Sequence, residues 1–169
     1  SMVGEHNIKN ILASCIAHYC LDLNLEKFAM IINSKNLKNI RLTKTKWIRG
    51  STLIDDSYNA NPDSAKKSID LLSCYKKRTF FILGDMLELG RYRKKLHKNI
   101  GEYANAKGID FLIGYGKLTK HAIESFGKNG IFFKKEEELK TYLKENVTSK
   151  DVILIKGSRG MKMERFINV

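Results

Sequence analysis

The sequence predicts an α/β protein built on a doubly wound, Rossmann-like sheet whose strands are mostly parallel. From residue 52 onward, short apolar runs alternate with helical patterns, which favours a parallel sheet covered by helices on both faces. Two stretches differ from that pattern: the polar–apolar alternation at 41–48 indicates an N-terminal β-hairpin, and 5–35 is purely helical. We therefore expect a helical segment, 1–38, followed by an α/β domain, 39–169.

The stretch 5–35 is expected to form a pair of helices. From Ile8 to Leu23 the apolar side chains recur at offsets of three and four residues, which is the spacing of a single helix face. Asn24 then offers a side-chain oxygen that can cap a second helix over 25–33.

The α/β part begins with the predicted hairpin. Residues 41–48 form its first strand, 49–51 turn the chain, and 52–56 form the second strand. Asn61 can then cap a helix, and Pro62 suits the first helical position, where its missing N–H costs no hydrogen bond.

Each later strand is a short apolar run followed by a helical pattern. The remaining predicted strands are 79–83, 110–115, 130–133 and 151–156. The predicted helices are 62–73, 93–107, 117–126 and 135–145, with a short last helix within 157–166. In sheets with right-handed crossovers of this kind, ligands bind beyond the carboxyl ends of the strands.

The composition excludes several classes of protein. Apolar residues make up 43% of the 169 residues, enough for a packed core, and no apolar stretch reaches the roughly 18 residues of a membrane span. The three cysteines are unclustered and the four histidines do not join them at metal-ligand spacing, so we expect no disulfide framework, no metal site and a reducing, cytoplasmic compartment. The net charge of +13 is spread along the chain, which favours a lysine-rich surface; a basic, non-enzymatic nucleic-acid-binding module is the alternative.

Polar side chains gather where the strong strands end. The segments are "IDDSYNANPDS" (54–64), "FILGDMLELG" (81–90) and "VILIKGSRG" (152–160). The lysine, arginine and glycines of the third suit an anion, because backbone N–H groups and the dipole of a following helix would point at it. The two acids of the second could hold an ammonium group or a cation, or could cap a helix. The chain contains no phosphate-binding G-x-x-x-x-G-K-[ST] motif and no nucleophile elbow.

Taken together, 54–64, 81–90 and 152–166 resemble the C-terminal domain of the Mur ligases, and most closely the branch that adds D-Ala-D-Ala. The segment "GEHNIKNILAS" (4–14) resembles the helix near the end of that family's central ATPase domain. The resemblance implies that 1–38 is a helical remnant of the ATPase domain and that 39–169 is the C-terminal domain.

The resemblance also implies an activity: ATP-dependent formation of an amide bond in peptidoglycan synthesis. In such enzymes ATP phosphorylates the carboxylate of a UDP-N-acetylmuramoyl-tripeptide, and the amine of D-Ala-D-Ala attacks the acyl phosphate, with Mg²⁺ as the metal cofactor. The family's phosphate-binding loop and its metal-binding acids lie upstream of these motifs. We therefore expect the chain alone to be an inactive C-terminal fragment.

The resemblance assigns several residues to ATP. They are Asn7, Asn10, Arg41, Asp56, Tyr58 and Asn59. Asn7 and Asn10 are expected on the adenine side, and Asp56 at the ribose. Arg41 matches the linker arginine that reaches the ATP phosphates and is the expected catalytic residue, with Arg49 as a competing candidate.

A second group is expected to face the amino acceptor: Asp85, Glu88, Lys156, Ser158 and Arg159. A sister ligase that adds a diamino acid is the alternative within the family. Without the ATPase domain, the apolar stripe at 8–23 is expected to fold back on the domain or to pair between two copies of the chain.

Overall fold

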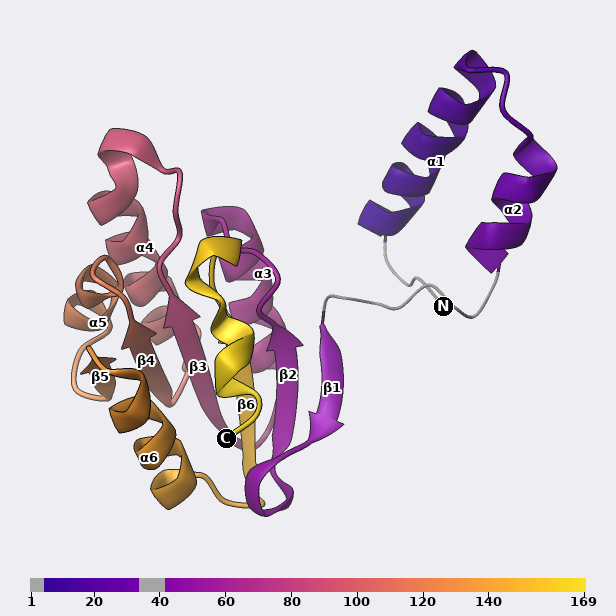
Figure 1. Ribbon diagram of the computed structural model, residues 1–169. Coiled ribbons are helices and arrows are strands. Elements are labelled where there is room, and N and C mark those ends of the chain that lie inside the picture. Colours follow the sequence, from indigo (N-terminus) through magenta and orange to yellow (C-terminus); the bar gives the residue numbers. More distant parts are fainter. Residues whose placement is uncertain (1–4, 34–41) are drawn as a thin grey trace. The chain divides into compact units, whose positions relative to one another are not determined.

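The structure is a computed structural model that describes residues 5–33 and 42–169, with side chains described from Asn10 onward in the first of these ranges (Figure 1). The chain divides into two compact units, Ser1–Asn39 and Ile40–Val169. No helix in the described ranges is both long enough and apolar enough to cross a bilayer.

The first unit is a pair of helices, α1 (Glu5–Cys20) and α2 (Leu25–Asn33). The side chain of Asn24 accepts a hydrogen bond from the backbone N–H of Lys27 at 2.8 Å, so the predicted cap of the second helix is confirmed. None of the described side chains of the pair, those of residues 10–33, is buried. Leu12, Ile16 and Tyr19 on α1 are more than half exposed.

The second unit contains a six-stranded sheet with the strand order β1-β2-β6-β3-β4-β5. The strands are β1 (Thr43–Lys46), β2 (Thr52–Asp56), β3 (Arg78–Gly84), β4 (Phe111–Tyr115), β5 (Gly130–Phe133) and β6 (Asp151–Lys156). β1 is antiparallel to β2, and the other neighbours are parallel. The predicted hairpin and mostly parallel sheet are therefore confirmed.

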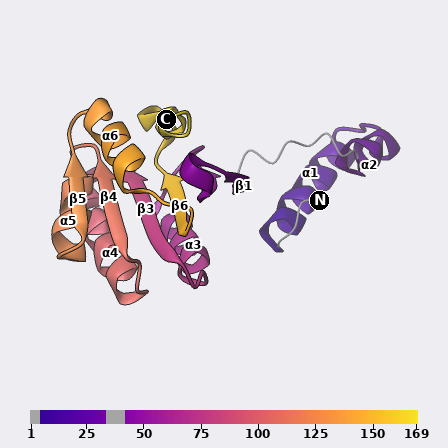
Figure 2. The same ribbon diagram turned by 90° about the horizontal axis from the view of Figure 1, so that it is seen from below.

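Helices cover both faces of this sheet, as the doubly wound prediction requires (Figure 2). On one face lie α3 (Pro62–Ser73), α4 (Arg93–Ala106) and α5 (Thr119–Phe126), which pack on strand residues such as Phe81 and Leu154. On the other face, α6 (Glu136–Asn146) packs on Phe80 and Ile153. Because successive strand residues point to opposite faces, each central strand contributes to both cores.

A short helix was predicted within 157–166, but the structure has no α-helix there. The chain forms two 3₁₀ turns there, η3 (Arg159–Met161) and η4 (Met163–Phe166), separated by Lys162 in a left-handed conformation with φ of 49°. The break brings Met163 back under the end of β3, where its side chain packs on the glycine at the end of that strand. Two further 3₁₀ turns occur in the described part of the chain, η1 (Ile48–Gly50) in the hairpin and η2 (Gly90–Tyr92) before α4.

Candidate functional site

Three loops meet at the carboxyl ends of β2, β3 and β6, and the hydroxyl of Ser158 joins them. It donates a hydrogen bond to the carbonyl of Ala60 at 3.1 Å and accepts one from the backbone N–H of Leu87 at 2.8 Å. The backbone N–H of Ser158 also donates to the carbonyl of Asp85 at 3.1 Å. Since Ser158 is only 5% exposed, it fixes the loops from within.

Beneath these loops lies a buried ion pair. The ammonium of Lys156 donates to a carboxylate oxygen of Asp56 at 2.5 Å and to the carbonyl of Asn59 at 2.9 Å. The same oxygen of Asp56 accepts from the hydroxyl of Ser68 at 2.7 Å. The pair forms because β6 lies beside β2 with Lys156 in register with Asp56. The adjacent Asp55 instead accepts from the backbone of its own loop, through the N–H of residue 57 at 2.9 Å.

The outer surface of the first loop carries groups that a ligand could reach. Tyr58 is 40% exposed, and the guanidinium of Arg159 lies over its ring, 5.8 Å from the centroid. The side-chain oxygen of Asn59 accepts from the backbone N–H of Arg159 at 3.4 Å. Arg159 also forms an ion pair with Glu164 at 3.2 Å. An exposed aromatic ring with a cation above it can stack on a planar base.

Asp85 caps a helix, although not the one that follows it in sequence. One carboxylate oxygen accepts hydrogen bonds from the backbone N–H groups of Leu118 and Thr119, both at 2.9 Å, at the start of α5. Gly116 lets the chain pass close by: a Cβ atom there would lie 2.6 Å from the carboxyl carbon of Asp85, and its φ is +119°. The side chain of Asp85 is therefore used by the fold.

His97 of α4, which the sequence analysis did not predict as a site residue, holds the loop after β3 in place. Its Nε2 atom accepts from the backbone N–H of Met86 at 2.9 Å, and its Nδ1 atom donates to the carbonyl of Arg93 at 2.7 Å. Burial lowers the pKa of His97, so the ring is neutral at neutral pH. Neutrality is required, because a protonated ring could not accept the hydrogen bond from Met86.

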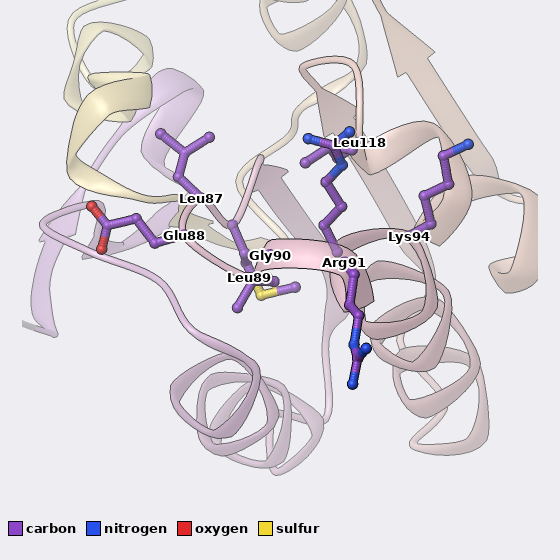
Figure 3. A pocket seen from close by; sticks show the side chains of 9 residues that line it. Leu87, Glu88, Leu89, Gly90, Arg91, Lys94 and Leu118 are labelled. Carbon is purple, nitrogen blue, oxygen red and sulfur yellow. The ribbon is translucent and has the colours of Figure 1, made fainter.

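A pocket of about 680 Å³ opens between this loop and α4 (Figure 3). Its lining comes from the β3 loop, the start of α4 and the loop before α5: Met86, Leu87, Glu88, Leu89, Gly90, Arg91, Arg93, Lys94 and Leu118. Of the predicted site residues, Glu88 alone lines it. The basic residues Arg91, Arg93 and Lys94 were missed, because in the sequence they belong to the polar face of an ordinary helix start.

The predicted residues thus separate into groups. Asp56, Tyr58, Asn59 and the acceptor-side residues lie together at one edge of the sheet. Asn10 is an exposed residue of α1 in the first unit, whereas Arg41 and the side chain of Asn7 lie outside the described residues. Arg49 lies in η1 with φ of 51° and donates to the carbonyl of Glu145 at 3.3 Å. The described residues include no cluster of acids, histidines or cysteines that could hold a metal ion.

Comparison with known proteins shows the family. Residues 40–159 match the Mur ligase glutamate ligase domain, which is most of the second unit. The chain belongs to the Mur ligase family.

Relatives within the family are named UDP-N-acetylmuramoyl-tripeptide–D-alanyl-D-alanine ligases. The protein of Bacillus subtilis is 34% identical over 98% of this chain, and that of Escherichia coli is 34% identical over 97%. The chain spans 38% and 36% of the length of these two relatives. The family membership thus applies to a stretch that is little more than a third as long as either relative.

Solved structures of the same family have this fold. A MurF structure from Acinetobacter baumannii has a TM-score of 0.79 and 25% identity, covering 98% of this chain and 38% of that one. A MurF structure from Thermotoga maritima in complex with ADP has a TM-score of 0.67 and 28% identity, covering 94% and 36%. The α/β fold predicted from the sequence is confirmed by these similarities.

Proposed function

We propose that this chain is the C-terminal part of an ATP-dependent ligase that joins D-Ala-D-Ala to a UDP-N-acetylmuramoyl-tripeptide. The observation that carries the proposal is the similarity to ligases of that name over nearly the whole chain. The grouping of the predicted site residues at the carboxyl edge of the sheet supports it, since ligands of such sheets bind there.

The reaction would proceed in two steps. The γ-phosphoryl group of ATP passes to the tripeptide carboxylate, and ADP leaves. The amine of the dipeptide then attacks the acyl carbon, the C–O bond to phosphate breaks, and the amine loses a proton as the amide forms. Such catalysis depends on positioning and charge stabilisation.

This chain would contribute part of the nucleotide site and the acceptor site. Tyr58 and Asn59 would lie beside the nucleotide, with Arg159 above the tyrosine ring. Asp56 already accepts a hydrogen bond from Lys156, so it would bind a ribose hydroxyl either beside that bond or in exchange for it. Asn7, Asn10 and Arg41 stay predictions of the resemblance. The described residues supply no cluster of acids, histidines or cysteines that would hold Mg²⁺.

The domain division is part of the proposal. The helices of 1–38 would be the end of the ATPase domain, and 39–169 would be the C-terminal domain. The three free cysteines fit a reducing compartment such as the cytoplasm.

The test compares acceptors in the full-length ligase that contains this chain. Phosphate release from ATP is measured with the UDP-tripeptide and either D-Ala-D-Ala or diaminopimelate, and this chain alone serves as a control. We expect phosphate release by the full-length ligase to require the dipeptide, and we expect this chain alone to release no phosphate. Release driven by diaminopimelate would favour the sister ligase, and release by this chain alone would refute its role as a fragment.

Two further expectations concern partners. The α1–α2 pair encloses an apolar groove of about 410 Å³, and we propose that copies of the isolated chain associate through this pair. Light scattering that shows a monomer, with fast amide exchange along α1, would contradict association. We expect no function in nucleic-acid binding; RNA binding that survives physiological salt would overturn that expectation.

A further inference from the structure

The pocket beside the β3 loop carries opposite charges at its two ends. Figure 3 shows the carboxylate of Glu88 on one side, and the guanidinium of Arg91 and the ammonium of Lys94 on the other. The lining also includes the apolar side chains of Leu87, Leu89 and Leu118. Arg93 adds a third basic residue to the lining, so positive charge exceeds negative charge.

This arrangement suits a small zwitterion whose charges are separated by an apolar stretch. A carboxylate between an arginine and a lysine gains charge-assisted hydrogen bonds. A dipeptide of two extended residues is about 7 Å long, and it places its amine and its carboxylate at opposite ends. The methyl groups of two alanines would meet the apolar lining, and a cavity of about 680 Å³ has ample room for them.

The loop that lines the pocket is held in a fixed shape. Glu88 has a φ of 63°, a left-handed conformation that is costly for a residue other than glycine. The hydrogen bonds from Met86 to His97 and from Leu87 to Ser158 hold the residues that precede it. Arg91 is also ordered, because it donates to the hydroxyl of Tyr92 at 2.8 Å and stacks on that ring.

The two ends of the pocket differ in their neighbours. Leu87, next to Glu88, lies close to Gly160, since a Cβ atom on that glycine would be 2.9 Å from the leucine side chain. Gly160 follows Arg159, which lies over Tyr58 on the surface proposed for the nucleotide. The acidic end therefore adjoins the nucleotide side, and the basic end lies away from it, on η2 and the start of α4.

We propose that this pocket binds the acceptor dipeptide with its C-terminal carboxylate at Arg91 and Lys94 and its amine toward Glu88. The proposal rests on the proposed function, because it names where and in which direction that acceptor binds. It assigns specificity for a free C-terminal carboxylate to Arg91 of η2 and Lys94 in the first turn of α4. The amine then points to the side where the acyl phosphate must form.

The experiment uses the full-length ligase and two acceptors, D-Ala-D-Ala and its C-terminal amide. The wild-type enzyme should prefer the acid in kcat/KM by about tenfold to a hundredfold, the range expected for hydrogen bonds to a charged group. The double variant R91Q/K94Q should lose this preference through a raised KM for the acid, with the KM for ATP unchanged. Lys95→Gln, an exposed neighbour on α4 outside the pocket, is the matched control and should keep the preference.

Glu88→Gln separates the two ends of the pocket. Because Glu88 faces the amine, this variant should raise KM for the acid and for the amide by the same factor and should keep the preference between them. If R91Q/K94Q kept the wild-type preference, or if the wild-type enzyme used both acceptors equally, the proposed orientation would be wrong. If the wild-type enzyme used no form of the dipeptide, the proposed function itself would be overturned.

Discussion

Replacing Lys156 by methionine tests how strongly the buried ion pair holds the carboxyl edge of the sheet. The side chain is 2% exposed, and its ammonium donates to the carboxylate of Asp56 and to the carbonyl of Asn59. Methionine fills most of the same volume, so the loss of unfolding free energy should come from the missing charge and hydrogen bonds. Asp56 would keep the hydroxyl of Ser68 as its partner but would lose the opposite charge.

Removing one partner of a buried pair costs about 3–5 kcal/mol in unfolding free energy. For a urea slope of about 2 kcal/mol per molar, a loss of about 4 kcal/mol lowers the midpoint by about 2 M.

Trp47 reports the unfolding. It is the single tryptophan of the chain, it is partly buried, and its indole N–H donates to the carbonyl of Ile167 at 2.6 Å. Lys150→Met, an exposed lysine just before β6, is the control and should change the midpoint little. A loss of unfolding free energy below about 1 kcal/mol for Lys156→Met would mean that the pair does not hold this edge together.

Three other predictions concern the same edge. Ser158→Ala should cost about 1–3 kcal/mol in urea unfolding, because a partly buried N–H donor and a buried carbonyl acceptor lose their partner; an unchanged midpoint would contradict the role of Ser158 as the joining group. Burial lowers the pKa of His97 below its ordinary value of 6.5, so the unfolded state takes up the proton first. Stability should therefore fall as the pH drops below about 6.5, and a His97→Gln variant that shows the same fall would refute this assignment. Gly116→Ala should destabilise the domain by about 1–3 kcal/mol, because the new Cβ would meet the carboxyl group of Asp85 and φ is positive; wild-type thermal stability would count against it.

The elements that local chemistry specifies could be predicted from the sequence. Asn61 and Pro62 marked the start of α3, and the structure has the complete capping box there, with Ser64 as the reciprocal partner. The strand 151–156 was predicted with its observed bounds, because a run of six residues buried on both faces is almost continuously apolar. Turn chemistry and hydrophobic period are properties of neighbouring residues, so they are visible in one chain.

What the sequence could not show depends on strand order. Nothing local indicates that β6 lies between β2 and β3, so the pairing of Lys156 with Asp56 could not be anticipated. The resemblance placed both residues at ligands, and they are each other's partners. His97 occupies a helical position like any other, and its bond to Met86 exists only after α4 has packed. The last helix was mispredicted because Met163 must turn back onto the sheet.

The place of β6 in the sheet also bears on how the chain folds as it is synthesised. β6 comes last of the six strands and lies in the middle of the sheet, so β2 and β3 cannot join through it before β6 has been made. Until then, both strands present open edges that invite pairing with other chains. The loops that build the ligand edge come together only when β6 inserts. The contacts of Ser158 that join the loops after β2 and β3 would thus form in a single late step.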